Sequence, residues 1–196
     1  MPRRAGLSPD AIVDLALRIL DEDGPGALTL NAVAARAGVA PPSLYKHVRG
    51  LAELRVLVTV RVLEEMTARS AQAVLGRSGD EAVRALMRAY RAYVVAHPGR
   101  CAALVQEPHP AVAEAGRRLL EVVYAALRAY GLTGSAAVHA ARCLRSAAHG
   151  FAVLEAAGGF GLPEDLDTSY DLLIHMAISG LRTPPEEIEA GPADRA

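Results

Sequence analysis

Apolar residues recur three and four positions apart through almost all of this 196-residue chain. That spacing places them on one side of an α-helix, which has 3.6 residues per turn. Runs that alternate apolar and polar residues and are rich in β-branched side chains, as half-buried strands are, are missing. Hydrophobic residues make up 52% of the sequence, enough for a sizeable core. The pattern predicts an all-α protein of about nine helices.

The first 50 residues read as three helices. The first begins after Ser8, which can cap it. Thr29 can cap the second, over 30–37, and Gly38 suits the left-handed residue that often ends a helix. The consecutive prolines 41–42 fit the first turn of a third helix, where a missing N–H costs nothing. These residues predict an N-terminal helix-turn-helix domain over 1–50.

The remaining helices belong to an expected second domain over 51–182, for ligand binding and dimerisation. Their expected ranges are 51–75, 80–97, 99–106, 110–130, 135–157 and 168–181. From Thr183 on, prolines and acids predominate and Ile188 is the one large apolar residue. That composition predicts a disordered tail over 183–196.

The distribution of charge matters more than its total. A formal net charge of -1 excludes a globally basic nucleic-acid binder. From Gly24 through Ala52, however, there is no Asp or Glu, while Arg36, Lys46 and Arg49 lie inside this window. Duplex DNA is a dense polyanion, so a surface that meets it gains from cations and from a lack of carboxylates. An exposed helix that lacks acids by chance is the alternative.

The third helix is the candidate DNA-reading element. At 100° per residue, Pro42, Lys46 and Arg49 lie on one side of it, while Leu44 and Val48 turn toward the core. The outer side could enter a major groove, where Lys46 would reach a guanine edge or a phosphate.

Other groups in the same segment are suited to phosphate. The Tyr45 hydroxyl can donate to a phosphate oxygen, although a structural prop for the hairpin is the alternative role for this residue. The N–H groups after Gly50 offer a further anion site at a helix N-terminus. The candidate DNA-contacting residues are Thr29, Arg36, Pro41, Pro42, Ser43, Tyr45, Lys46, His47 and Arg49.

The stretch LTLNAVAARAGVAPPSLYKHV resembles the DNA-binding signature of the TetR family of transcriptional regulators, and the likeness spans roughly residues 7–53. It implies a repressor that binds double-stranded operator DNA as a homodimer and is released by a small-molecule effector. Many relatives place serine or threonine at the start of the third helix, where this chain has Ala40. That departure removes a capping side chain worth about 1 kcal/mol.

A looser resemblance lies in SAAHGFAVLEAAGGFGLPEDLDTSYDLLI. It is similar to the C-terminal part of a TetR subgroup marked by a Trp-His-Gly or related His-Gly element. Ala148-His149-Gly150 stands in that place here, without the tryptophan. This likeness names no effector.

Two sets of residues in the C-terminal half are candidates for binding. An apolar seam at spacings of three and four could form a four-helix dimer interface, with ordinary packing inside one chain as the alternative. The candidate dimer residues are Ala140, Leu144, Ala147, Phe151, Leu154, Leu173, Ala177 and Ile178. Bulky side chains and a polar row could line an effector pocket, although an aromatic stripe is more often core. The candidate pocket residues are Met87, Tyr90, Tyr93, Tyr124, His139, Cys143 and Ser146.

The sequence leaves two other function classes as alternatives. An enzyme or metal sensor would use His97, Cys101, His139 and Cys143, but no HExxH, P-loop or GxSxG motif accompanies them. We therefore expect no enzymatic activity, no metal and no cofactor. A helical adaptor that binds protein through the apolar seam is the second alternative. With no targeting segment and no 18-residue apolar stretch, we expect a cytoplasmic protein without a membrane partner.

Overall fold

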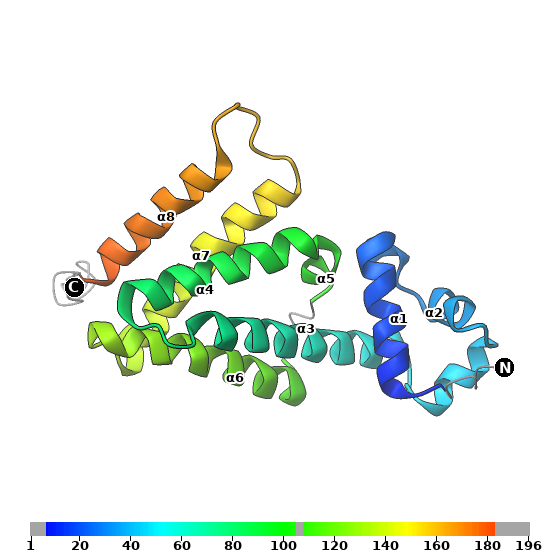
Figure 1. Ribbon diagram of the computed structural model, residues 1–196. Helices are drawn as coiled ribbons and strands as arrows, with labels where there is room; N and C mark the ends of the chain where they lie inside the picture. The colour runs from blue at the N-terminus through cyan, green and yellow to red at the C-terminus, as the bar shows by residue number, and fades with distance from the viewer. Residues whose placement is uncertain (1–6, 105–107, 183–196) are drawn as a thin grey trace, which may run out of the picture. The chain divides into compact units, whose positions relative to one another are not determined.

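The computed structural model describes residues 7–104 and 108–182, and every regular element in these residues is a helix (Figure 1). The predicted all-α fold is confirmed. The elements are α1 (Pro9–Glu22), η1 (Pro25–Ala27), α2 (Leu30–Ala37), η2 (Pro41–Lys46), α3 (Leu51–Val74), α4 (Gly79–Ala96), α5 (Pro98–Ala102), α6 (Pro110–Leu127), η3 (Arg128–Tyr130), α7 (Gly134–Ala156) and α8 (Leu166–Leu181). The three η segments are 3₁₀ helices. The predicted tail over 183–196 lies outside the described residues.

The chain divides into two compact units. Of the described residues, those of Met1–Ala68 and Tyr93–Leu119 form the first unit, and those of Arg69–Ala92 and Leu120–Ala196 form the second. Three helices, α3, α4 and α6, therefore contribute residues to both units. The domain boundary predicted after residue 50 falls inside the first unit.

The first unit begins with α1, an amphipathic helix. The Ser8 side chain accepts a hydrogen bond from the backbone N–H of Ala11 at 3.2 Å, as predicted for its cap. One face of the helix is buried, including Ile12, Ala16 and Leu20, so α1 is the helix around which the small core of this unit forms.

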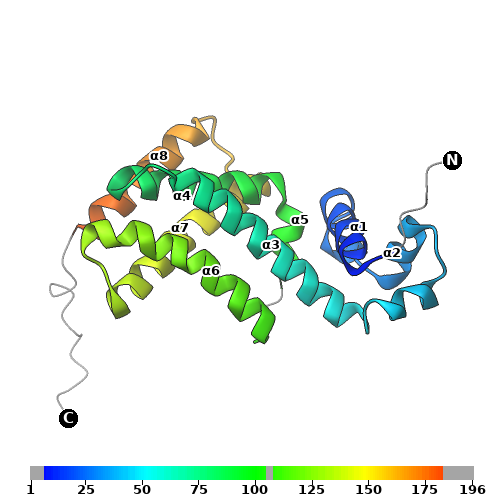
Figure 2. The same cartoon turned by 60° about the horizontal axis from the view of Figure 1, so that its bottom comes forward.

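Helix α2 has the boundaries that its sequence predicts. The Thr29 hydroxyl accepts from the Ala32 N–H at 3.1 Å, and Gly38 ends the helix at φ +66° in the left-handed region. Val33 and Ala34 are buried, and α2 packs against both α1 and η2 (Figure 2). The small Ala34 side chain lets the helices approach closely.

The third helix differs from the prediction in its geometry. Residues Pro41–Lys46 form a 3₁₀ helix rather than an α-helix. The Ser43 N–H donates to the Ala40 carbonyl at 2.9 Å and the His47 N–H to the Leu44 carbonyl at 2.8 Å, both three residues back. Two prolines remove N–H donors from a segment of only six residues. Too little length remains to propagate the four-residue bond pattern of an α-helix.

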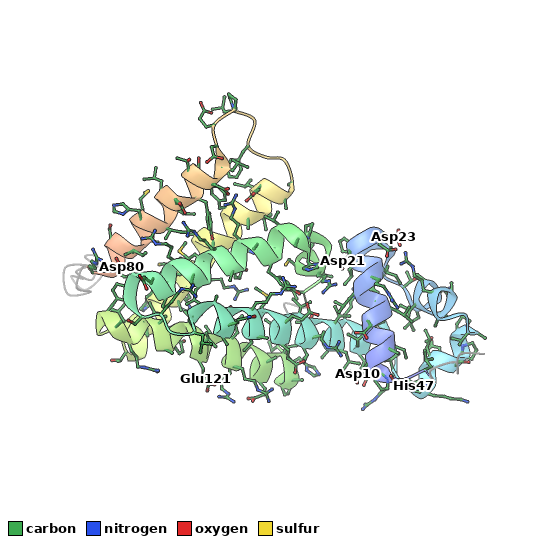
Figure 3. All side chains as sticks on the ribbon, viewed as in Figure 1. Asp10, Asp21, Asp23, His47, Asp80 and Glu121 are labelled. Atoms are coloured by element: carbon green, nitrogen blue, oxygen red, sulfur yellow. The ribbon has the colours of Figure 1, made fainter. Side chains whose placement is uncertain are left out.

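In the second unit, helices pack around one apolar core. Its buried members come from α4, α6, α7 and α8, and include Val83, Leu127, Leu144, Tyr170 and Ile174. Figure 3 shows Asp80 at the start of α4, where it forms an ion pair with Arg182 just after α8 and accepts a hydrogen bond from Tyr130 at 2.8 Å. The ends of these elements are thereby held together.

Arg91 of α4 holds α7 and α8 in this unit. Its guanidinium donates to both oxygens of Glu155 at 2.6 and 2.8 Å and to Asp167 at 2.7 Å. It also lies over the rings of Phe151 and Tyr170, at 5.4 and 4.8 Å from their centroids. These contacts fix the α7–α8 connection against α4.

Candidate nucleic-acid interface

The inner side of the helix-turn-helix is closely packed. Leu44 is fully buried and Val48 is 1% exposed, as their spacing predicts. The Val48 N–H donates to the Leu44 carbonyl at 3.0 Å, which completes the last turn of this segment. These two apolar side chains fix which side of 41–48 faces outward.

The outer side presents an aromatic hydroxyl and a cation. Tyr45 is 59% exposed, Lys46 is exposed, and the prolines 41–42 are exposed as well. Ser43 and His47, the latter labelled in Figure 3, are half-buried. Tyr45 is therefore directed to solvent in this conformation, and its hydroxyl can reach a ligand.

The 3₁₀ geometry changes which of these side chains share a face. With three residues per turn, side chains three apart are eclipsed, so Ser43 aligns with Lys46 and Pro42 aligns with Tyr45. The α-helical period had instead grouped Pro42 with Lys46 and Arg49. The structure thus corrects the pairing of Pro42 with Lys46, because the local bond pattern is tighter than the assumed one, while Arg49 lies beyond the 3₁₀ segment.

Arg36, a candidate DNA contact, is ion-paired within the chain. Its guanidinium binds the carboxylates of Glu22 and Asp23, the latter at 2.7 Å. Their hydrogen bonds and charges raise the pKa of Arg36 above its ordinary value. Glu22 and Asp23 lie just before the acid-free window 24–52 in the sequence, but the fold brings both carboxylates to Arg36 inside that window.

The N-terminus of α3 also has a carboxylate partner. Glu53 accepts a hydrogen bond from the Arg49 N–H, and its other oxygen lies 3.6 Å from the Arg49 guanidinium. The Arg49 side chain is 93% exposed, so this pair is a weak surface contact. Glu53 thus places a carboxylate in the first turn of α3, beside the N–H groups after Gly50 that were predicted to bind an anion.

Thr29, the remaining DNA candidate, is exposed at the start of α2 with its hydroxyl engaged as the cap. It can still contact a phosphate through the hydrogen of that hydroxyl.

The candidate pocket residues fall into three groups. Met87, Tyr90 and Tyr124 pack in or against the core of the second unit. Tyr93 instead lies in the first unit, 1% exposed, and donates to Glu65 at 3.0 Å. The three polar candidates on α7 are exposed, and these are His139, Cys143 and Ser146.

His149 of the His-Gly element contacts α4. Its Nδ1 lies 3.1 Å from the Tyr90 hydroxyl, and the two rings meet edge to face. Ala148 is buried and Gly150 is exposed. The element thus joins α7 to α4.

The candidate dimer residues lie at different depths. Leu144 and Ile178 are buried in the chain's own core, and Leu154 is 50% exposed. The others pack partly buried against that core, namely Ala140, Ala147, Phe151, Leu173 and Ala177. The sequence reasoning missed Leu172 and Met176, which are 60% and 62% exposed on α8. Their spacing of four could have revealed a second apolar stripe on that helix.

The histidines and cysteines that were candidates for catalysis or metal binding lie in different surroundings. His97 Nδ1 lies 3.1 Å from Asp21, and burial raises the pKa of the Cys101 thiol to about 11. Among the described residues, no group of three or more His, Cys, Asp or Glu side chains is arranged to hold a metal ion. No described helix is long and apolar enough to cross a membrane.

Two family models match the chain. The model described as "Bacterial regulatory proteins, tetR family" matches residues 12–54, and "Tetracyclin repressor-like, C-terminal domain" matches residues 83–177. The first contains the helix-turn-helix described above, and the second contains most of the core of the second unit.

Full-length relatives agree with these matches. The HTH-type transcriptional regulator Rv0681 of Mycobacterium tuberculosis is 38% identical over 182 residues, covering 89% of this chain and 82% of that protein. The HTH-type transcriptional regulator YobS of Bacillus subtilis is 35% identical over 183 residues, covering 92% and 96%.

Solved structures show the same fold. A protein of Rhodococcus sp. RHA1 superposes with a TM-score of 0.78 at 25% identity, over 93% of this chain and all of the other. The TetR family protein ActR of Streptomyces coelicolor, in complex with (S)-DNPA, gives a TM-score of 0.67 at 25% identity, over 91% and 98%. With its capped helix-turn-helix and its second helical unit, the chain belongs to the TetR family of ligand-responsive, DNA-binding transcriptional regulators.

Proposed function

We propose that this protein is a homodimeric repressor that binds an operator through 41–49 and is released by a small organic effector. One observation carries the DNA-binding part. Burial of Leu44 and Val48 turns Tyr45 and Lys46 outward, and their segment, residues 24–52, contains no Asp or Glu. Such a surface suits phosphate contacts and one or more base edges.

The roles of the two outward side chains differ. Lys46 supplies the positive charge that Arg36 cannot supply while it is bound to Glu22 and Asp23. Tyr45 supplies a hydroxyl donor and a flat apolar ring. We assign Lys46 and Tyr45 the main contacts, with Ser43, His47 and Arg49 adjoining, and Thr29 at the edge.

Titration of fluorescent DNA from directly upstream of the protein's own gene tests this assignment. The wild-type protein should prefer that DNA to a scrambled duplex of equal length at modest salt. Lys46→Ala should weaken binding and reduce the slope of log K against log salt by about one, because one phosphate contact is lost. Tyr45→Phe should weaken binding with little change in slope.

Arg77→Ala serves as the matched control, because Arg77 lies outside 41–49, in the connection after α3, where its side chain donates to the Ala73 carbonyl at the end of that helix. It removes one positive charge and should leave the affinity nearly unchanged. No sequence preference in the wild-type protein would refute operator binding and favour the adaptor alternative.

The proposed dimer uses the outer faces of α7 and α8. Leu154 on α7 and Leu172 and Met176 on α8 are half or more exposed. Exposed leucine and methionine at a helical spacing of four suit a second copy of the same helix pair, which would bury both sets at once. Leu144 and Ile178 would then support this face from inside rather than contact the partner.

Light scattering after gel filtration tests the dimer. Met176→Glu should convert a dimer to a monomer, because it places a charge in the apolar contact. Leu75→Glu is the control, since Leu75 is 79% exposed outside α7 and α8. A wild-type monomer at micromolar concentration, or a dimer that survives Met176→Glu, would contradict this face.

The effector proposal rests on the fold of the second unit and on ActR, whose structure holds (S)-DNPA. We assign Met87, Tyr90 and Tyr124 to the effector site. The His149 ring, which is hydrogen-bonded to the Tyr90 hydroxyl, would hold that tyrosine in place. The exposed row on α7 and the separately placed Tyr93 are less suited to it. Release of bound operator DNA by aromatic compounds, lost in Tyr90→Ala, is the expected outcome.

A further inference from the structure

Helix α5 meets the end of α1 through a backbone contact that admits only glycine. A Cβ at Gly99 would lie 2.0 Å from the Leu20 carbonyl oxygen and 3.0 Å from its carbonyl carbon. Neither atom can move without moving α1, because both belong to its backbone. Gly99 therefore sets how closely α5 approaches the first helix of the helix-turn-helix domain.

The next residue, Arg100, binds two other helices of the same unit. Its Nε and Nη2 donate to the Asp21 carboxylate of α1 at 2.5 to 3.0 Å, and its Nη1 donates to Glu65 of α3 at 2.9 Å. The Arg100 side chain is only 13% exposed. Burial lowers the pKa of its guanidinium, but the hydrogen bonds with Asp21 and Tyr93 and the nearby carboxylates raise it by more.

Helix α4 joins the same group of side chains. The Tyr93 hydroxyl donates to Glu65 at 3.0 Å, and His97 Nδ1 lies 3.1 Å from the Asp21 carboxylate, which Figure 3 labels on α1. The Tyr93 and His97 rings are 5.1 Å apart. We name this group the α5 latch, and its members are Asp21, Glu65, Tyr93, His97, Gly99 and Arg100.

The α5 latch holds α1, which is connected by packing to the DNA-reading segment 41–49. Helix α1 packs against α2, and α2 packs against η2, so a displacement of α1 reaches Tyr45 and Lys46 through packed side chains. No latch residue belongs to 41–49. Its members come instead from α1, α3, α4 and α5 with the residue that precedes α5.

We propose that Gly99 and Arg100 are positioning residues that hold α1, and with it η2, in the arrangement that binds operator DNA. This inference rests on the proposed operator binding. A broken latch leaves the DNA contacts present but less well positioned, so affinity falls without the loss of a phosphate contact.

The test compares the affinity and the salt dependence of Arg100→Ala with those of the wild-type protein on the upstream DNA. We expect Arg100→Ala to bind about tenfold more weakly, within the usual range of coupling between two sites. The slope of log K against log salt should stay unchanged, in contrast to Lys46→Ala. Asp21→Asn should give a similar loss, and the double variant should lose little more than either single variant.

Glycine substitutions provide the matched pair. Gly99→Ala should reproduce the loss of affinity at unchanged slope, because its methyl group forces α5 away from Leu20. Gly116→Ala, in α6, meets no atom within 4 Å and should bind as the wild-type protein does. Circular dichroism melts of all variants, with binding measured at least 15 °C below each midpoint, restrict the comparison to folded protein.

The outcomes separate the two proposals. If the wild-type protein shows no preference for the upstream DNA, operator binding itself fails. If the wild-type protein binds and folded Arg100→Ala and Gly99→Ala bind equally well, the latch does not position α1. A slope reduced by about one in Arg100→Ala would make this residue a phosphate contact and would also overturn the inference.

Discussion

In the first unit, the fold determines which charged side chains form ion pairs and which face solvent. Arg36 and Arg100 both carry a fixed positive charge, yet each is held by carboxylates that lie far away in sequence or on another helix. Lys46 lies outside such pairs among the described ion pairs, which leaves its ammonium group for a ligand. The charge of a residue in sequence thus says less about its role than the acids around it.

The carboxyl of Asp21 predicts a dependence of stability on pH. Burial raises its pKa, but the hydrogen bonds and charges of Arg100 and His97 outweigh that effect, so the pKa lies below its ordinary value. A carboxyl with a lowered folded-state pKa stabilises the fold above its unfolded pKa of about 3.9 and loses that contribution as pH falls further. Urea midpoints between pH 6 and pH 3 should therefore fall less steeply in Asp21→Asn than in the wild-type protein.

Cys101 predicts slow reaction with alkylating agents. Burial raises the pKa of its thiol to about 11, so little thiolate is present at pH 8. Mass spectrometry after iodoacetamide treatment should show slow labelling of Cys101 at pH 8 and faster labelling in urea. Equal rates in the folded and the urea-unfolded chain would show that this thiol is not protected.

At the scale of the element, the beginnings and ends of α1 and α2 are the features that the sequence predicts best. Ser8 and Thr29 cap α1 and α2, and Gly38 ends α2, because each effect depends on neighbouring backbone groups alone. The third helix was predicted less well. Its prolines favour a helical first turn, but they do not decide between three and 3.6 residues per turn.

The left-handed residue at Gly38 allows a direct test. Gly38→Ala should lower the free energy of unfolding by about 1 kcal/mol, because a side chain there strains the backbone although the space is open. Gly38→Asn should lose less, since asparagine adopts this conformation more readily. Denaturant titration of the two variants measures the difference, and a neutral Gly38→Ala would argue against a required left-handed residue.

At the scale of the whole molecule, ion pairs that join helices differ greatly in burial. Arg91 is 15% exposed and binds Glu155, which is 17% exposed, while Arg88 on the same helix binds Asp171 with both side chains about half exposed. The buried pair also stacks on two aromatic rings, so its loss leaves Glu155 without its main partner. Arg91 should therefore matter more to stability than Arg88.

Two arginine substitutions on α4 test this difference. Arg91→Ala should lower the free energy of unfolding by about 2 kcal/mol, between the loss for a surface pair and that for a fully buried one. Arg88→Ala should cost less than about 1 kcal/mol, the range for surface pairs. Thermal melts of both variants give the comparison, and equal losses would mean that burial of the Arg91 pair adds nothing.

The sequence by itself determined the helical class, the caps, the inward direction of Leu44 and Val48, and the family. These follow from local periodicity and from backbone groups within four residues, which the order of amino acids contains directly. Only the tertiary structure decided that Arg36 is ion-paired, that Leu172 and Met176 are exposed, and that Gly99 touches the Leu20 backbone. Those features depend on which helix faces meet across long separations in the chain, and a 3.6-residue period alone fits several such packings equally well.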